Sequence, residues 1–192
     1  MLQSIHSRAS SVVTTKINLL NYTIRTDYLI GQSFFITLIK RWNIMRLPDY
    51  IKDFEQWKSE FSFHIPIKIR FSETDMFGHV NNVSPFIYFE EARIEFLYKI
   101  NLFGQLNDDV QLAPVVADLQ CDYLKQIFFG DQLKLYVKAH HIGSSSIDLH
   151  YMAINQRNEV VLTGRGTIVQ INVKTGRPTP FNEEQLNKLR NV

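Results

Sequence analysis

The chain has 192 residues, of which 45% are hydrophobic and 21% are charged, with 8 glycines and 6 prolines. This composition excludes a disordered, collagen-like or low-complexity protein and indicates one compact domain with an additional segment. Cys121 is the only cysteine, which excludes an intrachain disulfide and favours a reducing compartment, the cytoplasm. The longest apolar run, residues 28–39, is interrupted by a Gly-Gln-Ser stretch and is shorter than the ~18 to 20 residues of a membrane span.

The formal net charge of +2 is unevenly distributed along the chain. Residues 1–44 contain five basic residues and one acid, whereas the remainder contains 16 basic and 18 acidic residues. A protein that reads a phosphate backbone needs clustered Lys and Arg on its folded body, and residues 45–192 show no such cluster. The sequence therefore predicts no nucleic-acid partner.

Residues 1–44 differ in composition from the rest of the chain. They are rich in Ser, Thr and Asn and show no sustained helical or strand periodicity. We weigh three interpretations: a targeting sequence, a small accessory element, and a chain whose natural start is Met45, which we favour. We expect 1–44 to be an N-terminal extension that is poorly ordered or not native, and 45–192 to be the functional domain.

The predicted elements of the domain follow a simple order. A helical pattern begins near Met45 and places apolar residues three or four apart. A half-buried strand over 64–71, with Phe71 on its buried face, leads into a polar turn over 72–82 and then a long helix over 84–103 closed by Gly104. Four strands over 113–127, 131–141, 146–155 and 160–173 follow, joined by segments of hairpin length, and Asn182 caps a short final helix. The pattern predicts an α+β domain in which an antiparallel five-stranded sheet, its last four strands a meander, wraps around one long helix.

The long helix carries polar residues in unexpected places. Arg93 lies within the apolar arc and Glu90 lies at its edge, three residues away. The favoured interpretation is a buried structural ion pair, and the alternative is a catalytic Glu90 carboxylate with a raised pKa. Ile87, Ile94 and Leu102 fall on the outward side, which indicates a second layer that a partner subunit could supply.

The turn over 72–82 concentrates the chemistry of this sequence. It holds two carboxylates, a histidine, two carboxamides and a glycine directly before the start of a helix. Backbone N–H groups at a helix start polarise a carbonyl or hold an oxyanion, and a nearby carboxylate acts as nucleophile or as base for water.

This turn resembles a known family. The pattern R-x-x-E-T-D-x-x-G-H-V-N-N over residues 70–82, followed by YFEEAR over 88–93, resembles the hotdog-fold acyl-CoA thioesterases of the 4-hydroxybenzoyl-CoA thioesterase type. The core of this pattern, D-x-x-x-H-V-N-N over residues 75–82, is similar also to that of the plant acyl-ACP thioesterases. The resemblance covers roughly residues 63–181 and implies a hotdog fold.

The resemblance also implies roles for individual residues. Asp75 matches the catalytic carboxylate, and the N–H groups near residues 81–83 match the donors to the thioester carbonyl. His79 matches the histidine of the acyl-ACP enzymes, although Phe77 stands where those enzymes have asparagine, so His79 is expected to orient the loop. We assign catalysis to Asp75, His79 and Asn82. Substrate binding is assigned to seven residues: Gly78, Asn81, Phe77, Tyr88, Gly143, Ser144 and Ser145.

The remaining candidates are weaker. His140 and His141 are adjacent on a predicted strand, so their side chains point to opposite faces and do not share a metal ion. Cys121 alternates with apolar neighbours and is interpreted as a small buried hydrophobic residue. The Gly143–Ser145 turn is either a plain hairpin or, as the resemblance implies, part of the coenzyme A entrance.

We therefore expect an acyl-CoA or acyl-carrier-protein thioester hydrolase that needs no metal or bound cofactor and forms a homodimer or homotetramer. A hotdog hydratase or dehydratase acting on acyl thioesters is one alternative. A non-catalytic acyl-CoA-binding regulator is the other.

Overall fold

The computed structural model describes residues 18–19, 22–23, 47–102 and 111–191. The expected domain boundary at residue 45 and most of the N-terminal extension lie outside these ranges, as do Phe103 and Gly104. Within the extension, Asn18–Leu19 (β1) and Tyr22–Thr23 (β2) form a short antiparallel pair. The domain contains α2 (Phe54–Ser59), β3 (Phe63–Lys68), the 3₁₀ turn η1 (Phe71–Glu73), α3 (Ser84–Lys99), β4 (Leu112–Tyr123), β5 (Gln132–Ile142), β6 (Ser146–Asn155), β7 (Val160–Asn172) and α4 (Glu183–Arg190).

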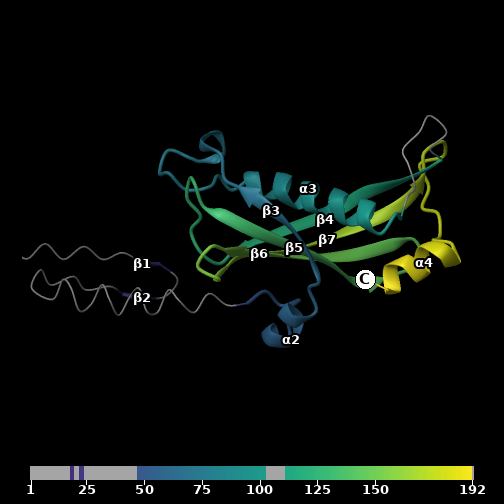
Figure 1. Ribbon diagram of the computed structural model, residues 1–192, viewed down its shortest axis with the longest axis horizontal. Helices are drawn as coiled ribbons and strands as arrows, with labels where there is room; N and C mark the ends of the chain where they lie inside the picture. Colours follow the sequence, from purple (N-terminus) through teal and green to yellow (C-terminus); the bar gives the residue numbers. More distant parts are fainter. Residues whose placement is uncertain (1–17, 20–21, 24–46, 103–110, 192) are drawn as a thin grey trace, which may run out of the picture. The chain divides into compact units, whose positions relative to one another are not determined.

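The five strands β3 to β7 form one antiparallel sheet in the order β3-β5-β6-β7-β4, and α3 runs along one of its faces (Figure 1). The predicted α+β architecture is confirmed. The predicted four-strand meander is wrong, because only β5, β6 and β7 follow one another and β4 pairs with β7 at the far edge. The strand predicted over 113–127 ends at Tyr123, and the join predicted as a hairpin at 129–131 is part of a crossover over residues 124–131. The crossover residues have backbone partners elsewhere, since Ile127 accepts from the Val80 N–H (2.8 Å) and Phe128 bridges to His79.

The core lies between α3 and the sheet. Phe89, Ala92 and Phe96 of α3 are fully buried against alternate residues of the central strands, such as Leu149 and Tyr151 of β6. Burial of each large apolar side chain contributes about 1.5–3 kcal/mol relative to exposure, so this layer fixes α3, and with it the segment that precedes α3, on the sheet.

The long helix ends earlier than predicted. Asn101 adopts a left-handed conformation (φ 49°), its N–H donates to the Tyr98 carbonyl (2.9 Å), and the Leu102 N–H donates to the Leu97 carbonyl (3.1 Å). These two bonds form a Schellman motif, which terminates α3 at an asparagine instead of at Gly104. The motif turns Leu102 inward, where it is 3% exposed, so its predicted outward position is wrong. Ile87 and Ile94 are exposed as predicted.

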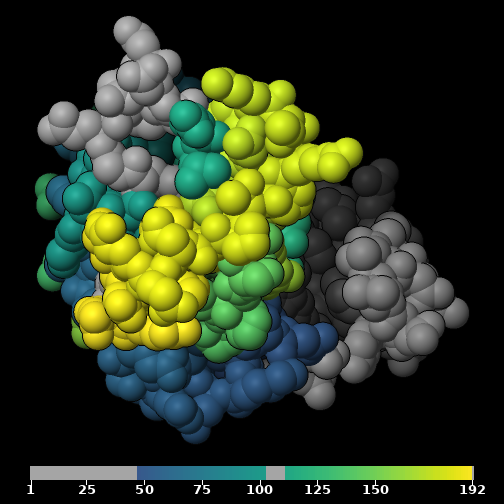
Figure 2. All heavy atoms as spheres, turned by 90° about the vertical axis from the view of Figure 1, so that its right-hand side faces the viewer, coloured from purple at the N-terminus to yellow at the C-terminus, as the bar shows by residue number. Residues whose placement is uncertain are grey.

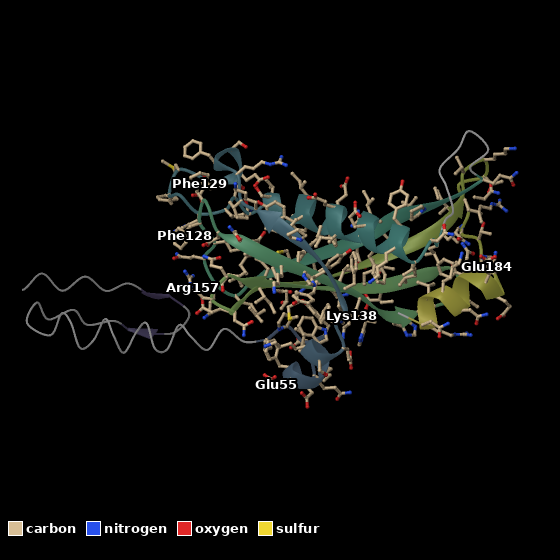
Figure 3. All side chains as sticks on the ribbon, in the orientation of Figure 1. Glu55, Phe128, Phe129, Lys138, Arg157 and Glu184 are labelled. Atoms are coloured by element: carbon tan, nitrogen blue, oxygen red, sulfur yellow. The ribbon has the colours of Figure 1, made fainter. Side chains whose placement is uncertain are left out.

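The face of the sheet opposite α3 is covered by the segment around α2. Asp53 caps α2 by accepting from the Gln56 N–H (3.0 Å), and Trp57 is buried with Met152 and Ile154 of β6. Trp57 Nε1 donates to Nδ1 of the fully buried His150 (2.8 Å). Lys138, which is labelled in Figure 3, donates from Nζ to the Trp57 carbonyl (3.0 Å). The helical segment predicted after Met45 is therefore a short helix that docks on the sheet through one tryptophan.

His150 makes the stability of the domain dependent on pH. Burial, followed by electrostatic repulsion from His140, Lys138 and Arg165, lowers the pKa of His150 to about 3, and the His140 ring stacks on that of His150 at 4.0 Å between centroids. The unfolded chain, with a histidine pKa of about 6.5, binds more protons between these two values, so stability decreases as the pH falls from about 6.5 towards 3. Between about pH 7 and about pH 5, we expect the free energy of unfolding to fall by ~2 kcal/mol more in the wild type than in His150→Gln. Urea unfolding of both proteins at both pH values measures this difference, and equal declines would contradict it.

The C-terminal helix α4 closes the end of the sheet at which α3 terminates (Figure 2). As predicted, Asn182 is its N-cap and accepts from the Gln185 N–H (2.8 Å). The buried Gln185 side chain donates to the Leu102 carbonyl (3.2 Å) and to Gln170 of β7 (2.8 Å). Among the described residues, no helix is both long and apolar enough to cross a membrane.

Candidate active site

The loop between η1 and α3 folds as a miniature hairpin. Thr74 bridges to Val80, and Gly78, with φ 78°, occupies the left-handed position of the turn. The Gly78 N–H donates to the Asp75 carbonyl (3.1 Å), and the Asp75 N–H donates to the His79 carbonyl (2.7 Å). Residues 127–128 of the crossover pair with this hairpin, so the loop is stabilised by backbone hydrogen bonds to the crossover as well as by its own.

The Asp75 side chain is half-buried and is oriented by its own loop. Its Oδ1 accepts from the Phe77 N–H (2.8 Å) and from the His79 N–H (3.2 Å). Hydrogen bonds between described residues leave Oδ2 unused. One carboxylate oxygen thus fixes the side chain, and the other is available to an incoming group.

The backbone amides at the start of α3 are mostly committed to local bonds. The Asn81 N–H donates to the Glu73 carbonyl (2.8 Å), the Val83 N–H to the Asn81 side chain (3.3 Å), and the Ser84 N–H to the Asn81 carbonyl (3.0 Å). Pro85 has no N–H group. Within the described chain, the Asn82 N–H has no hydrogen-bond partner, so of the three amides predicted at 81–83 it is the one left to hold a ligand oxygen.

The other loop residues lie around Asp75. The His79 ring packs edge-on against Phe128 at 5.0 Å between centroids, and the Asn82 carbonyl accepts from the Tyr123 hydroxyl at the end of β4. Phe77 is 73% exposed. Phe128 and Phe129, at the same end of the domain, are also exposed (Figure 3). The structure therefore brings together, at one end of the sheet, the predicted residues Asp75, Phe77, Gly78, His79, Asn81 and Asn82.

Glu73 supports this loop and was not assigned a role from the sequence. Its Oε2 accepts from the Arg70 N–H (2.8 Å) and from the Tyr88 hydroxyl (2.9 Å), while its backbone carbonyl accepts from Asn81 and from the Ser84 hydroxyl (3.1 Å). Tyr88 is buried, and burial together with the Glu73 carboxylate raises its pKa. Tyr88 was predicted to contact substrate, but its hydroxyl holds Glu73. In the sequence, the only feature that could have indicated this role is the three-residue spacing from Arg70 to Glu73, which is the spacing of a capping box.

We expect Tyr88→Phe to lower the free energy of unfolding by about 1.5 kcal/mol, the order of a hydrogen bond to a charged group. Tyr98→Phe is the matched control, because Tyr98 is on the same helix and is 54% exposed. Urea unfolding should show a change below ~0.5 kcal/mol for the control. Equal effects of the two substitutions would contradict the role given to the Tyr88–Glu73 bond.

Gly143, Ser144 and Ser145 lie at the opposite end of the sheet from Asp75. The Ser144 carbonyl accepts from the Phe181 N–H (2.8 Å), and the Ser145 carbonyl accepts from the Gln170 N–H (2.8 Å), beside α4. The length of β6, 10 residues at about 3.3 Å each, separates this hairpin from the Asp75 end. A single chain therefore does not bring these residues to the Asp75 loop.

The predicted ion pair within α3 is absent from the described chain. Glu90 is exposed, whereas Arg93 is 8% exposed and its Nη1 has no hydrogen-bond partner. Arg93 lies instead beside the Tyr151 hydroxyl, which also lacks a hydrogen-bond partner. The interpretation of Glu90 and Arg93 as an ion pair within one chain is wrong, because one side chain points to solvent and the other is buried.

Cys121 is half-buried, and burial raises its pKa to about 12, so it is a neutral thiol at physiological pH. The interpretation of this residue as a small hydrophobic side chain is consistent with its place at the edge of the core. The described residues contain no cluster of three or more His, Cys, Asp or Glu side chains that could hold a metal ion.

Residues 69–189 match the thioesterase-like superfamily. The chain belongs to this superfamily. It is 45% identical over 142 residues to the uncharacterized protein YsmA of Bacillus subtilis, covering 73% of this chain and 95% of YsmA. It is 28% identical over 119 residues to the acyl-CoA thioesterase YbgC of Haemophilus influenzae, covering 62% and 85% of the two chains. A thioesterase from Thermus thermophilus, solved in complex with coenzyme A and Zn, matches with a TM-score of 0.59 and 29% identity over 68% of this chain and 98% of that one.

These similarities confirm the hotdog fold and the thioester hydrolase class predicted from the loop motif. The matched region includes the Asp75 loop, all of α3 and the strands that follow. The similarity to plant acyl-ACP thioesterases stays a prediction.

Proposed function

We propose that this protein hydrolyses acyl-CoA thioesters, with Asp75 as the reacting carboxylate and the Asn82 N–H as the donor to the developing oxyanion. One observation supports the proposal above all. A carboxylate held by two backbone N–H groups keeps a free oxygen in the same loop as a free amide at the start of a 16-residue helix. The positive end of that helix favours negative charge on a bound oxygen.

In the proposed reaction the thioester carbonyl oxygen accepts from the Asn82 N–H. Asp75 Oδ2 either takes a proton from water, whose oxygen attacks the carbonyl carbon, or attacks that carbon itself. In both cases a tetrahedral intermediate forms, the carbon–sulfur bond breaks, and coenzyme A leaves as a thiolate that takes up a proton. In the second case, water then hydrolyses the acyl–Asp75 anhydride.

The loop residues have supporting roles in this proposal. The His79 N–H holds Asp75 Oδ1, and the Asn81 side chain and carbonyl fix the first turn of α3. Gly78 provides the left-handed turn, and the exposed Phe77 ring is available to the acyl group. No protein group in this scheme requires a metal or a bound cofactor. The single cysteine is consistent with the reducing cytoplasm as the place of action.

We propose that the working unit is a homodimer joined along β4. This strand is an edge of the sheet, and Val115 and Val116, 42% and 40% exposed, are adjacent residues that point to opposite faces of the sheet. An unpaired apolar edge of this kind is a template for pairing with a second chain. Antiparallel pairing about a two-fold axis places opposite ends of the two sheets together, so the Gly143–Ser145 hairpin of the partner subunit would lie on the side of the Asp75 loop. The exposed Ile87 and Ile94 are then available for further assembly to a tetramer.

A thiol-release assay with a panel of acyl-CoAs tests the proposed function. The panel runs from acetyl-CoA to palmitoyl-CoA, with benzoyl-CoA and an acyl-carrier-protein thioester as separate arms. We expect free thiol from at least one acyl-CoA at a kcat/KM in the ordinary enzyme range, above about 10⁴ M⁻¹ s⁻¹. An enoyl-CoA forms a further arm, and its consumption without thiol release would indicate a hydratase. Binding of acyl-CoA without turnover of any panel member would indicate a regulator.

A further inference from the structure

Four residues on one side of α3, spaced four, three and four positions apart, form a row that we call the seam: Phe86, Glu90, Arg93 and Leu97. Steps of four, three and four residues place side chains on one side of a helix, as in a helix that packs along another helix. Lys99 Nζ lies 4.9 Å from the centre of the Phe63 ring of β3 and marks the β3 side of α3. At 3.6 residues per turn, the seam lies about 120° to 180° around the helix from Lys99, on the side of β4.

In a single chain the seam residues are incompletely buried, and Arg93 has no ion-pair partner among the described residues. Phe89, Ala92 and Phe96, which face the sheet, are fully buried, whereas Arg93 and Leu97 each retain 8% exposure and Glu90 is exposed. The Nη1 atom of the Arg93 guanidinium is shut off from solvent without a hydrogen bond. An unpaired charge in such a position costs several kcal/mol, so a carboxylate that reached it would stabilise the arrangement strongly.

The order of the seam residues identifies where such a carboxylate can come from. The seam is symmetric about the midpoint between residues 91 and 92. When a second copy of α3 runs antiparallel about a two-fold axis through that midpoint, Phe86 faces Leu97 of the partner subunit and Glu90 faces Arg93 of the partner subunit. An isologous contact makes each pairing twice, so one seam supplies two apolar contacts and two ion pairs.

From this self-complementarity we infer that the α3 seam is a subunit contact, in which Glu90 of one subunit forms an ion pair with Arg93 of the other. The inference rests on the proposed dimer, because a partner joined along β4 brings its own α3 to the same side of the sheet. It also assigns the exposed Glu90 a role that differs from both earlier interpretations, the ion pair within one chain and the catalytic carboxylate.

Glu90→Arg tests the inference, because each dimer then loses two ion pairs and gains two contacts between like charges. We expect the dimer dissociation constant, measured by analytical ultracentrifugation, to rise at least ~100-fold, since such contacts cost several kcal/mol. Glu91→Arg is the matched control: it makes the same charge change at the neighbouring exposed position, off the seam, and should alter the constant less than ~3-fold.

A mixing experiment provides a second readout. Glu90→Arg and Arg93→Glu each repel themselves, but an equimolar mixture restores both ion pairs and should form heterodimers. If the wild type dimerises and Glu90→Arg weakens the dimer no more than Glu91→Arg does, the ion pair is refuted while the proposed dimer and hydrolase stand. A wild type that stays monomeric at every concentration would refute the dimer and the ion pair together. Thiol release from acyl-CoA, measured separately on the wild type, decides the proposed function.

Discussion

Asp75→Asn is expected to lower kcat for acyl-CoA hydrolysis at least ~100-fold, the scale of losing a group that transfers a proton in the transition state. The asparagine keeps an oxygen at the position of Oδ1, which accepts from the Phe77 and His79 N–H groups. The loop should therefore retain its conformation, and KM and the free energy of unfolding should change little. Steady-state kinetics and urea unfolding of the variant measure the three quantities.

Asp75→Ala separates chemistry from loop structure. It removes both the free oxygen and the acceptor of the two backbone N–H groups, so it should match Asp75→Asn in activity and lose about 1 kcal/mol of stability in addition. Activity of Asp75→Asn within tenfold of the wild type would remove Asp75 from the mechanism.

Gly164→Ala is expected to lower the free energy of unfolding by about 3 kcal/mol, at the upper end for overpacking of a core. Gly164 lies opposite Tyr151 in the sheet, and Phe89 of α3 stacks on the Tyr151 ring at 4.5 Å between centroids. A Cβ atom at position 164 would lie 2.6 Å from Phe89 Cε2 and 2.8 Å from the Gln120 carbonyl oxygen of β4. β4 cannot move away without breaking its hydrogen bonds to β7, so α3 must shift away from the sheet.

Gly143→Ala is the control for this substitution. The nearest atom to its added Cβ is the Ser146 hydroxyl, at 2.9 Å, which can rotate away, and the next is 3.4 Å distant. We expect less than ~1 kcal/mol of destabilisation. Similar losses for the two glycines would show that close packing of Phe89 on the sheet does not hold α3 in place.

Local signals in the sequence predicted much of the fold. The strand over 146–155 has the predicted bounds, since its alternation and its turn residues are unambiguous, and Asn182 caps α4 as its position indicated. The end of the first strand was missed: β3 stops at Lys68 and Phe71 is 76% exposed. The apolar alternation in the sequence continues through Phe71, but the Arg70 N–H donates to the Glu73 side chain, and the strand gives way to η1 at Phe71.

Features that depend on distant parts of the chain could not be predicted. The place of β4 at the far edge depends on its pairing with β7. Residues 124–127 were predicted as strand and 129–131 as a hairpin because no local residue shows that Ile127 pairs with Val80. The cluster around Asp75 was predicted because its members are close in sequence. The Gly143–Ser145 hairpin was placed with them only by resemblance, and a single chain keeps the two apart.

A crystal structure with a non-hydrolysable acyl-CoA analogue, in which a methylene separates the sulfur from the carbonyl, tests the central claim most directly. The account predicts the carbonyl oxygen within hydrogen-bond distance, about 3 Å, of the Asn82 backbone nitrogen, with Asp75 Oδ2 facing the carbonyl carbon. A carbonyl bound away from the first turn of α3, or one that Asp75 cannot reach, would contradict it.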